Sequence, residues 1–248
     1  MDMRLFLITF LFFKFFSPVY ANTIYYLTKI PNLKVYDLTA INGIKYLVAE
    51  KSFKVGIVEN NVQCNKPSEN DTKNKFKIIK KNLERYEKVF LEKINLKYVV
   101  LCENLKVSDI KTAGVPNHKV KTLIIDIKSD PKHFERSIHH ELFHMADDSY
   151  DNLFSYDKWE KFNILDFQYA ECSTCSNRSD LSLIQDSNGF ITEYSMSTAS
   201  EDMAEVFSFM MTDMDKLSII SQDDSILNNK INFIISEIQK IDNNFKFK

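Results

Sequence analysis

The segment His140-Glu141-Leu142-Phe143-His144 constrains the structure of this chain more than any other. Residues four positions apart on an α-helix lie on one face, one turn apart, so the two imidazoles can converge on a single ion. Asp130 is a good N-cap residue and Pro131 suits the first helical position, which together predict a helix over residues 130–148. Multiplied residue frequencies give a chance HExxH segment in roughly one chain in a hundred. The segment therefore predicts a helix that presents two metal ligands.

The same five residues indicate zinc. Zinc tolerates three protein ligands plus an open position, lowers the pKa of bound water to about 7 and polarises a carbonyl. Glu141, set beside the two histidines, is expected to act as the general base that takes a proton from this water and passes it to the leaving amine. His133 and His139 do not keep the spacing with Glu141, so we expect them at the surface or behind the ligands.

A catalytic zinc site needs a third protein ligand, and the best candidate lies in residues 194–207, YSMSTASEDMAEVF. Glu201 and Glu205 are one turn apart on a helix expected to begin near Ser200. The first can then bind zinc while the second fixes the tautomer of a ligand histidine. The alternative is that these acids only favour a helix N-terminus, with Thr198 and Glu201 as a capping box. Spacing alone leaves both interpretations open.

Three features in combination resemble the gluzincin family of zinc metallopeptidases. The HExxH segment ends in Asp147 and Asp148, and Tyr194 stands seven residues before the first glutamate of an ExxAE segment. The chain is similar here, over about residues 138–211, to the catalytic domain of anthrax lethal factor and to the secreted clostridial Pro-Pro endopeptidases. Residues 157–163, DKWEKFN, also resemble uncharacterised zinc metallopeptidases of bacteria. The N-terminal third has no counterpart in these proteins.

The resemblance implies a role for individual residues of the site. The zinc ligands it implies are His140, His144 and Glu201, with Glu141 as the base and Tyr194 as hydrogen-bond donor to the oxyanion. Glu205 and Asp148 are expected to support the ligands from behind. The long insert between HExxH and Tyr194 departs from these relatives, so their substrate choice is not transferred and Pro-Pro cleavage is not predicted.

The first 21 residues have the features of a secretory signal peptide. Arg4 lies near the start, an apolar stretch covers residues 5–16, and Val19-Tyr20-Ala21 supplies small residues where a signal peptidase cuts. Lys14 interrupts the apolar stretch, which is shorter than the ~20 residues of a spanning helix. We predict cleavage after Ala21 and a secreted or periplasmic protein without stable membrane insertion.

All four cysteines, Cys64, Cys102, Cys172 and Cys175, lie after the predicted cleavage site. An exported location permits them to pair, and four cysteines allow three connectivities. Cys172 and Cys175 form a CxxC, which is found in short-range disulfides, zinc ribbons and redox pairs. A second CxxC and a surrounding thioredoxin-like pattern are missing, so we favour a structural disulfide.

Composition narrows the range of partners. Lys and Arg total 32 against 34 Asp and Glu, so the chain has no net charge that would attract nucleic acid. With 44% hydrophobic residues and only 4 Gly and 5 Pro, it is typical of an ordered globular protein. The expected partner is a protein or peptide substrate.

The hydrophobic pattern predicts an α+β fold. Short β-type runs cover residues 33–38, 44–48 and 54–58 and predict a small antiparallel sheet, and an amphipathic spacing predicts one long helix over residues 76–94. Strands are expected at residues 98–101 and 122–127, the second as an edge strand beside the active-site helix. Residues 150–188 show no regular pattern, and a final helix is expected over residues 226–241.

These elements combine into one zincin-like domain over residues 22–248. A β-rich part covers about residues 22–62, a catalytic part with the HExxH helix packed on a mixed or antiparallel sheet covers 96–217, and a C-terminal helix covers 224–242. The predicted function is that of a secreted zinc-dependent endopeptidase. Two alternatives stay open: an inactive zinc-containing binding or effector protein, and a zinc amidase acting on a non-peptide or cell-wall amide.

Overall fold

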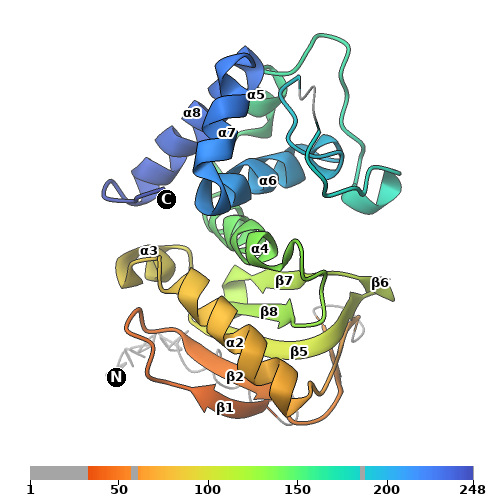
Figure 1. The fold of residues 1–248 in the computed structure, drawn as a ribbon, viewed down its shortest axis with the longest axis vertical. Helices are drawn as coiled ribbons and strands as arrows, with labels where there is room; N and C mark the ends of the chain where they lie inside the picture. The colour runs from red at the N-terminus through yellow and green to blue at the C-terminus, as the bar shows by residue number, and fades with distance from the viewer. Residues whose placement is uncertain (1–32, 57–60, 185–187, 248) are drawn as a thin grey trace, which may run out of the picture.

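The computed structural model describes residues 33–56, 61–184 and 188–247, and the predicted signal peptide lies outside these ranges. The elements in chain order are β1 (Leu33–Asp37), β2 (Lys45–Ala49), β3 (Phe53–Val55), β4 (Val62–Asn65), α2 (Glu69–Leu83), α3 (Lys88–Lys93), β5 (Tyr98–Val107), β6 (Ile110–Lys111), β7 (Gly114–Asn117), β8 (Thr122–Asp126), α4 (Phe134–Ser149), α5 (Tyr156–Glu160), α6 (Ala199–Thr212), α7 (Met214–Gln222) and α8 (Ser225–Ile241). Figure 1 shows α4 between the sheet and the C-terminal helices, which confirms the predicted α+β class.

The long strand β5 organises the mixed sheet. Its first half pairs in parallel with β2 on one side and β8 on the other, while β1 and β7 extend the sheet with antiparallel pairing. The second half bends away at Asn104, which has a φ of 56°, and pairs with β4 and β6. The Asp126 carboxylate holds the bend, because it accepts the N–H groups of Asn104 at 3.0 Å and Leu105 at 3.1 Å. The predicted run around residue 54 forms β3, which pairs with β4 and not with β1 or β2.

Two strands differ from the sequence-based prediction beside the HExxH helix. The stretch over residues 122–127 was expected at the edge of the sheet, but β8 lies inside it, paired with both β5 and β7. The outer strand is β7, in a stretch for which no strand was predicted. Proline has no N–H to give to a ladder and is found mainly in edge strands, so Pro116 is compatible with this position.

The predicted long helix over residues 76–94 is in fact two helices, α2 and α3, separated by a turn. Asn42 donates its side-chain amide to the Leu83 carbonyl at 2.8 Å, and Asn82 donates to the Ile78 carbonyl at 2.9 Å. Both bonds satisfy carbonyl groups near the end of α2, where the helix has no further N–H to offer. Asn42 is distant in sequence, so the apolar spacing of the segment gives no sign of the break.

Helix α4 begins at Phe134, four residues later than the predicted N-cap at Asp130. Asp130 instead closes a turn ahead of the helix, with its carboxylate accepting the Lys132 N–H at 2.9 Å. The segment predicted as irregular contains the short helix α5, and α7 follows α6 directly, which was not predicted.

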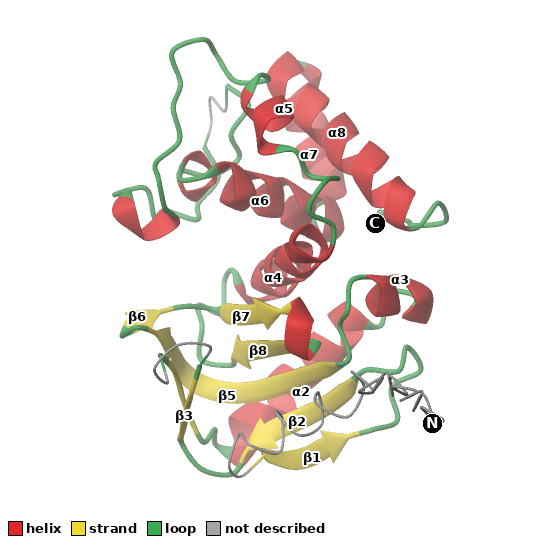
Figure 2. Ribbon diagram, turned by 180° about the vertical axis from the view of Figure 1, so that it is seen from behind, coloured by secondary structure: helices red, strands yellow, loops and turns green. Residues whose placement is uncertain are grey.

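One hydrophobic core runs through the molecule from Tyr46 in β2, through Leu142 in α4, to Ile238 in α8. A smaller cluster around Cys64 and Cys102 packs on the other face of the sheet. Figure 2 shows α4 again between sheet and helices, seen from behind. Among the described residues, the helices are all too short or too polar to cross a membrane.

Candidate metal centre

Helix α4 places two imidazoles side by side at the middle of the molecule. His140 and His144 are one turn apart, and their Nε2 atoms face each other at 3.2 Å. Apolar residues on the opposite face of α4, among them Ile138 and Leu142, are fully buried and fix the orientation of the helix against the core. The predicted pair of ligands is therefore brought together by the helix itself.

Glu201 joins the two histidines from α6, which packs against α4. Its Oε2 lies 2.9 Å from His140 Nε2 and 3.3 Å from His144 Nε2. Thr198 caps α6, because its hydroxyl oxygen accepts the Glu201 N–H at 3.2 Å. The cap does not exclude the ligand interpretation, since the Glu201 backbone takes part in the cap while its side chain faces the histidines.

The three side chains fit a bound cation. One ligand atom from each residue lies within 4.8 Å of the other two. His140 Nδ1 lies 3.0 Å from Glu205 Oε1, and a carboxylate only accepts, so Nδ1 carries a proton. His140 Nε2 faces Glu201 and His144, so these three groups need a positive charge between them, either a second proton or a metal ion.

The electrostatics of the cluster agree with this fit. Burial lowers the pKa of His140, but hydrogen bonds and attraction to Glu201 and Glu205 outweigh burial and raise it to about 10. Burial likewise raises the pKa of Glu201, but His144 and His140 hold it well below the usual range. The cluster therefore stabilises positive charge, whether a proton or a metal ion supplies it. Two imidazoles and a carboxylate form a donor set that suits zinc.

A further set of residues holds the cluster from behind. Glu205, nine-tenths or more buried on α6, binds His140 Nδ1 and also accepts the Thr192 hydroxyl at 2.9 Å. On the other side, His144 Nδ1 lies 3.3 Å from Ser200 Oγ, which donates to Asp147 at 3.1 Å. Such contacts fix the ring orientation and tautomer of ligand histidines. Glu205 thus lies where the sequence places it.

Asp148 lies away from the ligand cluster, although it was expected behind the ligands. Its side chain is about half exposed, and its carboxylate is 3.7 Å from His118 Nδ1. Asp147, one residue earlier, approaches His144 instead through Ser200. On a helix, positions three and four beyond a histidine both lie near its face, so the sequence does not discriminate between the two aspartates.

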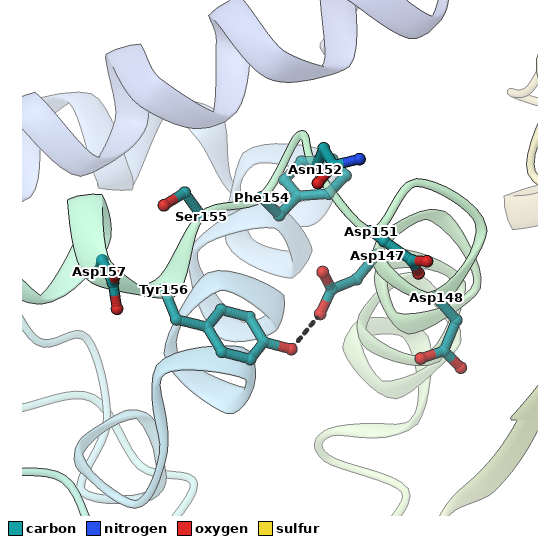
Figure 3. Close-up of a pocket in the computed structure, with 8 residues that line it drawn as sticks. All are labelled: Asp147, Asp148, Asp151, Asn152, Phe154, Ser155, Tyr156 and Asp157. Carbon is teal, nitrogen blue, oxygen red and sulfur yellow. Dashed lines mark hydrogen bonds between the residues drawn. The ribbon is translucent and has the colours of Figure 1, made fainter.

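An acidic pocket of about 440 Å³ adjoins the cluster through Asp147. Figure 3 shows Asp147 pointing to Tyr156 across this pocket, with the Tyr156 hydroxyl donating to the carboxylate at 2.7 Å. Asp148, Asp151 and Asp157 also line it.

Glu141 is buried beside the cluster and is 8% exposed. Burial raises its pKa, partly offset by attraction to His140 and His144 and by a hydrogen bond from the Gly114 backbone. Gly114 lies on the edge strand β7, so the sheet holds this carboxylate directly. Gly114 was not predicted as a site residue, although a chain with only 4 glycines makes each of them informative.

Tyr194 lies on the other side of His140, with its ring centroid 6.0 Å from that of the imidazole. It forms a short 3₁₀ turn, Tyr194–Met196, immediately before α6. Burial raises its pKa, and the charges of Glu201 and Glu141 raise it further, so the hydroxyl stays protonated. The structure therefore brings Tyr194 to the cluster as a neutral hydrogen-bond donor.

His139 is fully buried, so it does not lie at the surface, and the partners of its ring nitrogens are not the ligand histidines. Its Nδ1 meets the Tyr86 hydroxyl and its Nε2 lies 2.9 Å from Asn82 Oδ1. Its imidazole thus anchors α4 to the end of α2. His133 is partly exposed, and its Nδ1 lies at hydrogen-bond distance, 2.9 Å, from Asp130 Oδ2.

The four cysteines form two disulfides. Cys64 pairs with Cys102 across β4 and β5, and Cys172 pairs with Cys175 within the insert. The second pair is the short-range disulfide favoured from the CxxC spacing.

An α+β fold with a His/His/Glu cluster on two packed helices defines a class of candidate zinc proteins. The model of a protein family described as "putative zinc-binding metallo-peptidase" matches residues 105–240, more than half of the chain. The chain belongs to this family. The matched residues include the entire cluster and all of α4 and α6.

A crystal structure from Bacteroides caccae, described in the same words as the family, has a similar fold. It superposes with a TM-score of 0.51 at 15% sequence identity, covering 89% of this chain and 85% of the other. At this identity the likeness concerns the fold alone. No curated protein matches the sequence.

Proposed function

We propose that this protein is a zinc-dependent endopeptidase of the gluzincin type. The observation that carries the proposal is the position of Glu141, buried beside three convergent ligand side chains and held by the backbone of an edge strand. A protein that only stores or senses zinc has no need of a buried carboxylate that stays free of the metal. Membership of the metallopeptidase family supports the same conclusion.

His140, His144 and Glu201 would hold the zinc ion, each through one ligand atom. Zinc supplies Lewis acidity when bound, lowering the pKa of water and polarising a carbonyl. Glu205 keeps the His140 ring in the tautomer that leaves Nε2 free, and Ser200 does the same for His144.

Glu141 would move the proton during hydrolysis. Its raised pKa makes it a better base than an exposed glutamate, and its carboxylate can carry the proton from the attacking water to the leaving amine. Gly114 supports this role, because its N–H fixes the carboxylate against β7.

Tyr194 would donate a hydrogen bond to the oxyanion that forms on the scissile carbonyl. Preorganised donors of this kind are worth about 3–4 kcal/mol in other hydrolases. Its raised pKa keeps the proton on the hydroxyl at neutral pH.

The substrate is an extended peptide or protein segment. Strand β7 pairs with β8 on one side only, within the part of the chain that the structure describes, and it touches Glu141 through Gly114. An unpaired strand edge can bind an extended peptide by strand addition. The strand that would bind the peptide is therefore β7 and not the stretch over residues 122–127, which was expected at the edge of the sheet.

We further propose that the protein acts outside the cytoplasm. The predicted signal peptide supports this location, and so do two disulfides, which persist in oxidising compartments.

Digestion of a peptide library, analysed by mass spectrometry, tests the proposal. The zinc-loaded chain should generate new termini at internal peptide bonds, and the Glu141→Gln variant should generate none while binding the same amount of zinc. A Glu141→Gln variant as active as the wild type would overturn the mechanism. Bound zinc without any cleavage would instead favour a binding protein, or an amidase if cell-wall fragments were cut.

A further inference from the structure

Glu205, which binds the His140 ring from behind, has an arginine at its other oxygen. Arg136 lies on α4 one turn before His140, and its Nη2 is 3.7 Å from Glu205 Oε2. Only 12% of the Arg136 side chain and 2% of the Glu205 side chain are exposed. A buried carboxylate without a cation beside it is costly to keep in place. Because His140 is neutral when it binds a metal, the permanent positive charge beside Glu205 comes from Arg136.

The Arg136 guanidinium is held on two further sides. Its Nη2 donates to the Leu181 carbonyl at 2.7 Å. Its Cζ lies 4.4 Å from the centroid of the Phe209 ring, which is buried. Phe209 follows Glu205 by one turn on α6, so this helix offers the guanidinium a carboxylate and an aromatic face together. The guanidinium is therefore fixed in one position by contacts with α6 and with the insert.

The part of the insert that holds Arg136 also brings a second donor to Glu205. The Thr192 hydroxyl donates to Glu205 Oε2 at 2.9 Å. Thr192 forms a β-bridge with Leu183, two residues after the Leu181 carbonyl that binds Arg136. Both groups that contact Glu205 Oε2 are thus attached to the same two paired segments of the insert.

We propose that Arg136 is a positioning residue for the metal centre, which fixes Glu205 behind His140 and couples the insert to the ligand cluster. Thr192 and Arg136 occupy the Oε2 atom of Glu205, so Oε1 is left to accept from His140 Nδ1 at 3.0 Å. Without the arginine, the buried carboxylate would move from this position and the His140 ring would lose its support. The role rests on the zinc site of the proposed function, but it requires zinc binding only and not peptide cleavage.

Zinc affinity, measured by competition with a chromophoric chelator, tests the role. Arg136→Met should weaken zinc binding about fivefold, which is less than the roughly 10–100-fold loss expected when a direct partner of a ligand histidine is removed. Arg178→Met is the matched control, because Arg178 also donates to a backbone carbonyl, that of Met196, and also lies over an aromatic ring, that of Phe167. The control should bind zinc as the wild type does. Equal losses in the two variants, or no loss in Arg136→Met, would overturn the proposal.

A double-mutant cycle tests whether Arg136 acts through Glu205. In a Glu205→Gln background the amide oxygen can still accept from His140 but carries no charge, so Arg136→Met should have no further effect on zinc affinity. The double variant leaves no carboxylate buried without its cation, so it can be measured even where Arg136→Met alone does not fold. A loss in this background as large as in the wild type would show that Arg136 acts on the fold and not through Glu205.

The ring N–H signals of the ligand histidines separate this role from a general loss of stability. They are measured by NMR of the zinc-loaded protein with isotope-labelled histidine. Arg136→Met should shift the signal of His140, whose Nδ1 faces Glu205, and leave that of His144, whose Nδ1 faces Ser200. A His140 signal that stays in place, or equal shifts of both signals, would contradict the proposal.

These measurements fail separately from the proposed function. A chain that binds zinc but cleaves no peptide would overturn the peptidase function and leave the role of Arg136 standing. A peptidase in which Arg136→Met binds zinc as tightly as the wild type would overturn the role and leave the function standing. A wild-type chain without affinity for zinc would overturn both.

Discussion

Gly114 packs so closely against Glu141 that residue 114 has no room for a side chain. A Cβ built on Gly114 would lie 2.6 Å from Glu141 Cγ and 2.7 Å from its Cδ, closer than such atoms approach. Gly114→Ala should therefore displace the base and lower kcat about 10–100-fold with zinc binding unchanged, because small misplacements of a catalytic group are costly. Steady-state kinetics and zinc analysis measure the two effects.

Val115→Ala is the matched control for this substitution. Val115 lies on the same strand, but it packs against the small hydrophobic cluster around Cys64 and Cys102, on the other face of the sheet. The control variant should retain near-wild-type kcat. Full activity in Gly114→Ala would show that the Glu141 carboxylate does not need its place against β7.

Three carboxylates that were predicted at the site should differ in their effect on zinc affinity. Glu201→Ala removes a ligand and should weaken zinc binding by more than about 100-fold, whereas Glu205→Ala, which frees the His140 ring, should weaken it about 10–100-fold. Asp148→Ala should have no effect, because Asp148 contacts His118 instead. Competition with a chromophoric chelator measures all three, and a large loss in Asp148→Ala would contradict the geometry.

The residues that could be predicted are those whose relation is local. His140, Glu141 and His144 share one helical turn, so their geometry follows from their spacing. Gly114 and Ser200 were not predicted, because their contacts with Glu141 and His144 join different elements. Glu201 and Tyr194 were named through a family resemblance, since spacing alone left the glutamate open.

Helices α6 and α8 are joined by a buried ion pair next to the candidate ligand. Lys230 is 0% exposed, and its Nζ lies 2.7 Å from Asp202 Oδ2 and 2.8 Å from the Gly189 carbonyl. Asp202 also accepts hydrogen bonds from Trp159 in α5 and from Tyr169. One carboxylate thus ties the insert, α6 and α8 together.

Lys230→Met should destabilise the metal-free protein by about 3–5 kcal/mol, because it leaves the Asp202 carboxylate buried without its cation. Urea unfolding measures the loss. Lys240→Met, on the same helix but with a half-exposed side chain paired to Glu237, should cost less than about 1 kcal/mol. Equal effects of the two substitutions would show that the buried pair contributes no more than a surface one.

The elements themselves were predictable where a hydrophobic period persists, as in α4, α6 and α8. The break between α2 and α3 and the edge strand of the sheet were not predictable. The end of α2 depends on Asn42, which is 41 residues from its partner Leu83, and β7 is a strand only because β8 lies beside it. Such contacts override local propensity, and no pattern within the segment reports them.

At the scale of the whole molecule, the Cys64–Cys102 disulfide should contribute most of the covalent stabilisation. It closes a loop with a sequence separation of 38, which includes α2 and α3. In the chain-entropy model a loop of this length stabilises by about 4 kcal/mol. Cys64→Ala/Cys102→Ala should lose about this amount in urea unfolding, whereas Cys172→Ser/Cys175→Ser should lose much less. The opposite order would contradict the expected dependence of stabilisation on loop length.

The fold class was predictable because a metal-binding helix and a short run of strands leave few arrangements that bury both. The packing of the insert was not, since Trp159 and Tyr169 find their partner Asp202 across more than 30 residues. This packing brings the insert against the turn that carries Tyr194, where the Tyr194 N–H donates to the Asp180 carbonyl at 3.0 Å.

The central claim is that one zinc ion is held jointly by α4 and α6. Anomalous scattering at the zinc edge, measured on crystals of the zinc-loaded protein, tests it most directly. The account predicts a single peak about 2.0–2.2 Å from His140 Nε2, His144 Nε2 and a Glu201 carboxylate oxygen, with Glu141 outside this distance. A peak at another place, or a Glu201 side chain turned away from the metal, would contradict it.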